Sequence, residues 1–163
     1  MRHIVLTMML TMVTGFGWAG DEGDRILGLW ATDPEGEGGQ AHIEVSLNDG
    51  KYCGTIVWLA EPVYAADDEQ GMGGQAKVDR ENPDPDLKSR SIQGMVTFEG
   101  FTYAGKDKWK EGTIYDPDNG KTYSCTLRLT KKGLKVRGFI GISLIGRTSF
   151  WTRVPSGQED SQT

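Results

Sequence analysis

Short runs of alternating apolar and polar residues, separated by tight-turn signals, are the feature that most constrains how this chain can fold. The clearest signal is Asn48-Asp49-Gly50-Lys51, because Asp-Gly between alternating segments is typical of a two-residue hairpin turn. If Asn48 faces Lys51, one face of the hairpin is apolar and pairs Leu47 with Tyr52, Val45 with Gly54, Ile43 with Ile56, and Ala41 with Trp58. The other face is mixed and borders either solvent or a polar cavity; it carries His42, Glu44, Ser46, Cys53, Thr55 and Val57.

A second hairpin is predicted around residues 115–121, where Asp, Pro, Asn and Gly cluster. It joins a strand near 109–115 to one near 122–129, and further strands follow near 134–140 and 147–154. The Asp-rich tip does not fit an EF-hand calcium loop, because its glycine falls one place early and position twelve is Leu127 instead of glutamate.

Glycines separate these runs along the whole chain. The sequence has 23 of them, about twice the usual share of roughly 7%, and no stretch shows helical periodicity over more than two turns. Segments near 27–31 and 92–103 bring the expected total to about eight or nine strands. Closing the sheet removes its edges, so we expect an all-β fold, a small antiparallel up-and-down barrel of about eight strands. Residues 61–94 have no periodicity and predict one long loop, which is either functional or mobile.

The N-terminus has the pattern of a secretory signal. Arg2 and His3 precede a short apolar run, Ile4–Val13, and Gly17-Trp18-Ala19 offers a cleavage site. We therefore expect a signal peptide over 1–19, a single domain over 20–154 and a flexible tail over 155–163, in a periplasmic or secreted protein. An uncleaved anchor is the alternative, although the run is shorter than the roughly 20 residues that span a bilayer.

Charge limits the choice of partners. The chain has 18 basic and 23 acidic side chains, and loss of the leader would remove one basic residue, Arg2. An acidic balance disfavours nucleic acid or an anionic membrane as the main partner. The one basic cluster, Lys131, Lys132, Lys135 and Arg137, is interpreted as a solvated hairpin.

Catalytic signals are weak. In the predicted register Cys53 and His42 share a face but lie roughly 14 Å apart, too far for a catalytic dyad. The loop carboxylates could support acid–base hydrolysis, yet such residues in a Pro-rich loop are typical of solvated turns; they are Asp79, Glu81, Asp84 and Asp86. No zinc-ligand spacing is present. We expect no enzyme activity, metal or cofactor, with a hydrolase as an alternative.

Two short motifs resemble the lipocalin and wider calycin pattern, in which Gly-x-Trp on the first strand packs beneath an Arg on the last. The motifs here are Gly28-Leu29-Trp30 and Trp151-Thr152-Arg153. The resemblance implies that Gly28, Trp30 and Arg153 form a structural plug at the closed end of a barrel.

A more extensive resemblance covers residues 26–154. The sequence is similar to bacterial domain-of-unknown-function family 2147 in a set of runs that includes Cys53-Gly54-Thr55-Ile56-Val57-Trp58-Leu59, Asn82-Pro83-Asp84-Pro85, Leu87-Lys88-Ser89-Arg90, Gly112-Thr113-Ile114-Tyr115-Asp116-Pro117 and Lys135-Val136-Arg137-Gly138. This resemblance implies a secreted or periplasmic lipocalin-like barrel. Members often carry cysteines where this chain has Asn48 and Phe139, so the family pattern does not assign a disulfide.

The two cysteines leave two alternatives open. An oxidising compartment favours a Cys53–Cys125 disulfide. However, Cys53 is predicted on the mixed face of its strand and Cys125 on the apolar face of its own, and bridging needs Cα atoms within about 7 Å. Two buried thiols are the alternative.

Small barrels hold one ligand at their mouth, between apolar walls and a few orienting polar groups. We expect Trp58 and Trp109 as apolar walls, Tyr115 as a hydrogen-bonding wall, and Arg90 and Arg137 as anchors for a carboxylate or phosphate. Each has a structural alternative: core packing for the tryptophans, a salt bridge to a loop aspartate for Arg90, and an exposed hairpin cation for Arg137.

These observations favour a non-catalytic binder of a small amphipathic or anionic molecule. A cell-envelope protein-interaction module that docks through the long loop is the second hypothesis, and a hydrolase is the third. A cavity of roughly 300 Å³ or more would favour the first over the second.

Overall fold

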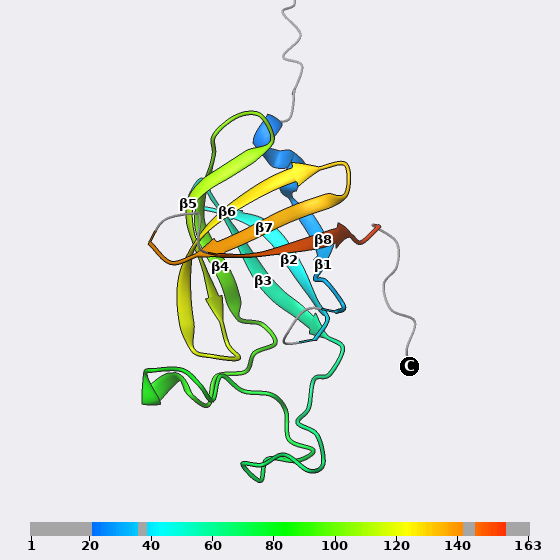
Figure 1. Ribbon diagram of the computed structural model, residues 1–163, viewed down its shortest axis with the longest axis vertical. Coiled ribbons are helices and arrows are strands. Elements are labelled where there is room, and N and C mark those ends of the chain that lie inside the picture. The colour runs from blue at the N-terminus through cyan, green and yellow to red at the C-terminus, as the bar shows by residue number, and fades with distance from the viewer. Residues whose placement is uncertain (1–20, 36–38, 142–145, 156–163) are drawn as a thin grey trace, which may run out of the picture.

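The computed structural model describes residues 21–35, 39–141 and 146–155, whose strands form a closed antiparallel barrel (Figure 1). Each strand pairs with the next in sequence, and the first closes on the last. The strands are β1 (Gly28–Ala31), β2 (Ala41–Asn48), β3 (Lys51–Leu59), β4 (Val96–Tyr103), β5 (Lys108–Asp116), β6 (Lys121–Thr130), β7 (Gly133–Phe139) and β8 (Gly146–Arg153). The predicted all-β, up-and-down barrel is confirmed. The expected signal peptide lies outside the described residues, as does the expected tail beyond residue 155.

The first hairpin follows the predicted register over most of its length. Asn48 pairs with Lys51, Val45 with Gly54 and Ile43 with Ile56. The pairing of Ala41 with Trp58 was wrong, because the register shifts between His42 and Ile43 and places Trp58 opposite His42. One extra residue in a strand moves the following side chains to the other face.

The upper end of the barrel in Figure 1 is closed by a short 3₁₀ helix, η1 (Glu22–Ile26). Ile26 is fully buried, and Trp30 on β1 is only 1% exposed and donates its indole N–H to the Ile26 carbonyl at 2.8 Å. Arg153 pairs with Trp30 across β1 and β8 and places its guanidinium carbon 4.3 Å from the centre of the Trp30 ring. The predicted stacking of Trp30 and Arg153 is present, and it closes this end of the barrel.

Gly28 completes this arrangement. Its φ is +110°, a conformation that residues with a side chain rarely adopt, and an added Cβ would lie 3.1 Å from Arg153 Nη1. The same guanidinium donates to the carbonyls of Leu27, at 2.8 Å, and Arg25. The glycine therefore gives the last strand's arginine room to hold the start of the first strand.

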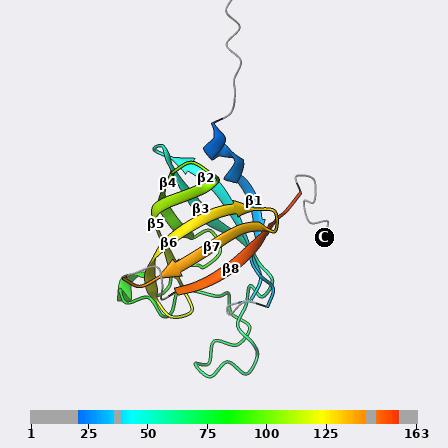
Figure 2. The same ribbon diagram turned by 45° about the horizontal axis from the view of Figure 1, so that its top comes forward.

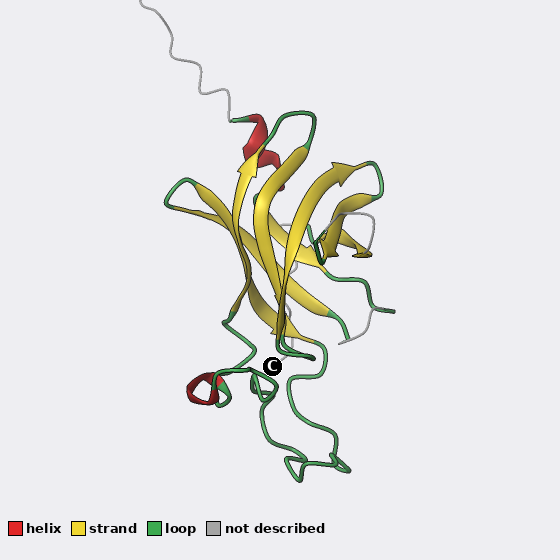
Figure 3. Ribbon diagram, turned by 60° about the vertical axis from the view of Figure 1, so that its left-hand side comes forward, coloured by secondary structure: helices red, strands yellow, loops and turns green. Residues whose placement is uncertain are grey.

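The opposite end carries the long loop between β3 and β4, which extends away from the barrel (Figure 3). Contrary to the expectation of an irregular stretch, it is organised by two isolated β-bridges, Val63 with Ala76 and Val78 with Ser91. Inside it, the Tyr64 hydroxyl donates to the Val78 carbonyl and accepts from the Val78 N–H. A second 3₁₀ helix, η2 (Pro85–Leu87), lies near its end.

No helix in the described ranges is long and apolar enough to cross a membrane.

Candidate functional site

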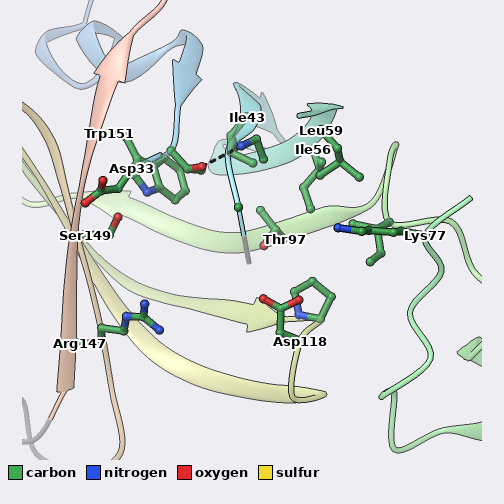
Figure 4. Close-up of a pocket in the computed structure, with 15 residues that line it drawn as sticks. Asp33, Ile43, Ile56, Leu59, Lys77, Thr97, Asp118, Arg147, Ser149 and Trp151 are labelled. Atoms are coloured by element: carbon green, nitrogen blue, oxygen red, sulfur yellow. Dashed lines mark hydrogen bonds between the residues drawn. The ribbon is translucent and has the colours of Figure 1, made fainter. Parts of the chain in front are cut away.

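A cavity of about 200 Å³ opens at the end of the barrel that carries the long loop (Figure 4). Its apolar wall comes from inward side chains of β2, β3 and β8 together with the end of the loop. Its polar rim comes from the β1–β2 connection, the loop, the β5–β6 turn and β8. The residues labelled around it are Asp33, Ile43, Ile56, Leu59, Lys77, Thr97, Asp118, Arg147, Ser149 and Trp151.

A second cavity of about 470 Å³ adjoins the first along β8. Both are lined by Arg147, Ser149 and Trp151. The rest of the second wall comes from β5, β6 and β7 and includes Ile114, Tyr115, Tyr123, Val136 and Gly138. The volume of the second cavity therefore exceeds the roughly 300 Å³ that a small-molecule site requires.

Strand alternation on β8 explains why three residues serve both cavities. Successive side chains of a strand point to opposite faces, and Trp151 is buried in the barrel while its neighbour Phe150 is 42% exposed. Arg147 and Ser149 share the Trp151 face, so the strand presents a cation, a hydroxyl and an indole in line along the cavity wall.

The rim of the mouth is charged. Arg147 extends from β8 toward the middle of the first cavity, and Lys77 of the long loop lies on the other side of it (Figure 4). Lys77 Nζ lies 3.4 Å from the exposed carboxylate of Glu61. Asp33 and Asp118 also lie at the rim, so the mouth has groups that can orient a polar head while the deeper walls are apolar.

The long loop is attached to the barrel by a buried carboxylate. Asp79 is 0% exposed and accepts three hydrogen bonds: from the Tyr115 hydroxyl at 2.6 Å, from Asn82 Nδ2 at 2.7 Å, and from Arg90 Nη2 at 2.6 Å. A buried charge needs such partners, because desolvation would otherwise disfavour it strongly. Asp79 therefore joins the second half of the loop to β5.

Tyr115 connects this cluster to the barrel wall, because it follows the cavity-lining Ile114 on β5 and its hydroxyl donates to Asp79. Burial, and then the hydrogen bond to Asp79, raises the pKa of Tyr115 to about 12. The phenol therefore stays protonated and holds the loop across the physiological pH range.

The β5–β6 turn also packs against the loop. Gly120 has a φ of +68°, and an added Cβ there would collide with the Glu81 carbonyl oxygen. A glycine is needed at this position both for its conformation and for the close approach of the loop backbone. In the loop itself, Asp68 pairs with Arg80 at 2.8 Å, and hydrogen bonding to Arg80 lowers the pKa of Asp68.

Two of the five predicted ligand-binding residues come together. Arg90 and Tyr115 both line a polar groove on the outside of β4 and β5, of about 370 Å³, and the Arg90 guanidinium carbon lies 5.9 Å from the centre of the Tyr115 ring. Arg90 binds Asp79, which is the loop-pinning alternative considered from the sequence.

The other three predicted residues are dispersed. Trp58 packs against His42 with ring centres 4.4 Å apart, on the face opposite to the one expected. Trp109 is 0% exposed and packs against Tyr52 and Tyr103 toward the closed end. Arg137 donates to Thr148 Oγ1 at 2.9 Å, on the outer face of β7 and β8.

Both cysteines are thiols, and the possible Cys53–Cys125 disulfide is not formed. Cys53 is partly exposed on the outer face of β3 and lies 3.4 Å from Ser46 Oγ, whereas Cys125 is buried on the inner face of β6. Burial raises the pKa of the Cys125 thiol to about 12. Their opposite faces explain the absence of a bridge.

The loop carboxylates are engaged in structure. Asp79 binds Tyr115, Asn82 and Arg90, and Asp84 accepts the N–H of Asp86 at the start of η2. Within ranges 21–35, 39–141 and 146–155, no group of three or more His, Cys, Asp or Glu side chains could hold a metal ion.

The sequence analysis missed Arg147, Ser149 and Trp151 as wall residues and Lys77 as a rim residue. The alternation Arg147-Thr148-Ser149-Phe150-Trp151 carried the signal, because a buried Trp151 places Arg147 on the same face four residues earlier. Lys77 had no such signal, since its position depends on how the loop folds back over the mouth.

Comparisons with known proteins agree with this architecture. The family model for uncharacterized proteins conserved in bacteria, DUF2147, matches residues 28–153, and the chain therefore belongs to this family. Among solved structures it is similar to protein HP1028 from the human pathogen Helicobacter pylori, described as belonging to the lipocalin family. That similarity has a TM-score of 0.68 at 24% identity over 82% of this chain and 85% of the other, which establishes the lipocalin-like fold. No curated protein sequence matches the chain.

Proposed function

We propose that this DUF2147 protein is a non-catalytic carrier or sensor that binds one small amphipathic, anionic molecule in the open end of its barrel, in the periplasm or after secretion. The observation that carries the proposal is the inward face of β8, where Arg147, Ser149 and Trp151 line both cavities. This face offers a cation for a carboxylate or phosphate and an indole for an apolar body.

The wall composition supports an amphipathic ligand. Apolar residues such as Ile114, Val136 and Trp151 surround the deeper space, while Arg147 and Lys77 lie toward the rim. An apolar tail would therefore enter the barrel and its anionic head would remain at the mouth, near both cations. The opposite end is closed by Trp30 and gives a ligand no exit there.

A protein-interaction module is the second candidate, because the long loop extends beyond the barrel and exposes Val63 and Leu87, at 45% and 38%. The two hypotheses, a ligand inside the barrel and a protein partner on the loop, predict different effects of filling the cavity. Filling the cavity would abolish the first activity and leave the second intact.

Gly138→Leu provides that test. Gly138 lines the second cavity, and an added Cβ would meet Ile114 Cγ2 at 3.5 Å and Tyr123 Cβ at 3.7 Å, ordinary packing distances. Ser124→Leu is the matched control, since Ser124 is exposed on the outside of β6.

We expect mass spectrometry of extracts to find a bound small molecule in wild-type protein and in Ser124→Leu, both secreted to the periplasm. Gly138→Leu should lose that molecule while it keeps its melting temperature. Equal retention in both variants would refute binding inside the barrel. A wild-type protein that never carries a small molecule would favour the interaction module.

A further inference from the structure

The charges of this chain are strongly segregated. Residues 121–155 contain eight basic side chains and no acidic one, whereas the rest of the sequence contains 10 basic and 23 acidic side chains. These residues form β6, β7 and β8, three neighbouring strands of the barrel. Although the net charge of the chain is negative, these three strands form one basic wall of the barrel, and they face the viewer in Figure 2.

The strand register aligns cations across the outside of this wall. Lys108 on β5 pairs with Arg128 on β6, and Arg128 pairs with Lys135 on β7. Neighbouring strands are about 4.8 Å apart. The three paired cations are therefore close enough to repel each other. Lys131 and Lys132 add two exposed cations at the turn between β6 and β7.

The cations of this row are not held in ion pairs within the described part of the chain. No salt bridge among those residues involves Lys108, Arg128 or Lys135. An external anionic surface would relieve the repulsion, and only this wall could approach it, because the remaining surface is acidic.

One exposed aromatic side chain, Phe150, accompanies the cations. Lys135 pairs with Phe150 on β8 and places Nζ 6.0 Å from its ring centre, and Phe150 is 42% exposed. Ile140, directly after β7, is 69% exposed but lines the second cavity at the open end, so it is not part of this contact. Cations beside a protruding aromatic side chain match the interface of an anionic bilayer, where phosphates lie next to the start of the acyl chains.

We propose that the outer face of β6–β8, called the basic wall here, binds reversibly to the surface of an anionic phospholipid bilayer. Arg128, Lys131, Lys132 and Lys135 contact lipid phosphates, and Phe150 inserts beside them. The barrel then lies on its side wall. This contact is independent of ligand binding at the mouth, since none of these residues lines either cavity.

Vesicle co-sedimentation tests this proposal with the full secreted protein. We expect binding to vesicles of phosphatidylglycerol and phosphatidylcholine, no binding to phosphatidylcholine alone, and release by high salt, which shortens the range of electrostatic attraction. The variant Arg128→Gln with Lys135→Gln should weaken binding about tenfold or more, because each cation near the surface contributes separately.

The matched control is Lys51→Gln with Lys88→Gln, which removes the same charge from two exposed positions outside the basic wall. It should bind within about twofold of wild type. Lys131→Gln with Lys132→Gln gives a second test in an exposed turn, should the strand variant be unstable, and should also weaken binding.

Equal losses in the wall and control variants would overturn the proposal, since net charge alone would then explain binding. Failure of wild-type protein to bind the anionic vesicles at low salt would also overturn it. Preferential binding of soluble polyglutamate over those vesicles would assign the wall to an acidic protein partner instead.

Discussion

The two ends of the barrel are built from different interactions. The closed end buries Ile26, Trp30 and Trp109 almost completely, and Arg153 covers the Trp30 ring. The open end is held by hydrogen bonds to one buried carboxylate, Asp79, and it leaves two adjoining cavities.

The two ends therefore differ in what they contribute: the closed end contributes mainly to stability, and the open end contains the space for a ligand. Large apolar side chains pack closely at the closed end. We therefore expect this end to contribute most to the free energy of unfolding. A polar cluster fixes a loop without filling the barrel, so the open end keeps room for a ligand. This division predicts that substitutions at the closed end cost the most stability and that changes on the outside of the barrel cost the least.

Removal of Trp30 should cause the greatest loss of stability. We expect Trp30→Ala to lower the free energy of unfolding by about 3 to 5 kcal/mol, because it empties a buried aromatic site. Denaturant unfolding measures the change. A loss below about 1 kcal/mol would contradict the claim that the closed end contributes most to stability.

Arg90 tests the polar cluster at the other end. We expect Arg90→Gln to lower unfolding stability by about 1 to 2 kcal/mol, since it removes one partly exposed charge-assisted bond to Asp79. Proteolysis between residues 61 and 94 should accelerate. Affinity for the co-purified molecule should change little, and a tenfold loss of affinity with an unchanged melting temperature would restore Arg90 as a ligand anchor.

Alkaline pH should weaken both ends, through buried Tyr52 at the closed end and partly buried Tyr115 at the open end. Burial raises the pKa of Tyr52 and of Tyr115 from 10.0 to about 12. The native state therefore holds protons that the unfolded chain releases, so their contribution is complete below about pH 10 and is lost as the pH rises to about 12.

Tyr115→Phe should reduce this alkaline loss of stability, measured by denaturant unfolding from pH 9 to about 12. Tyr52→Phe should do the same at the closed end. The prediction for the loop cluster fails if Tyr115→Phe keeps the full wild-type slope.

Thiol labelling should distinguish the outside of the barrel from its interior with little effect on stability. Partly exposed Cys53 should react with iodoacetamide in the folded protein, whereas Cys125, buried and with a pKa of about 12, should react only on unfolding. Mass spectrometry of the labelled protein measures both. Equal labelling rates under native conditions would show that the barrel wall opens readily.

The closed end was largely predictable from the sequence, and the open end was not. Gly28, Trp30 and Arg153 belong to two short motifs that resemble the calycin pattern, and that resemblance implied their contact. The hairpin register was also predictable until the bulge near His42 turned Trp58 to the opposite face.

Contacts at the open end depend on long-range folding of the loop. Asp79 meets Tyr115 across 36 positions, and nothing in the local sequence indicates that contact. Arg137 was selected as an anchor because it is a cation in a family-like motif, but strand parity places it outside. The same parity places Arg147 on the cavity side, and the sequence analysis did not use it.

Arg147 provides the most direct test of the central claim that an anionic amphipath binds in the open end. The measurement is fluorescence titration with dansylaminoundecanoic acid, which has a carboxylate head and an apolar chain. We predict that Arg147→Gln weakens binding about tenfold or more, which corresponds to the free energy of one charge-assisted hydrogen bond. The control variant Arg137→Gln, on the outer face, should bind within about twofold of wild type. Unchanged binding by Arg147→Gln, or an equal loss in both variants, would contradict the account.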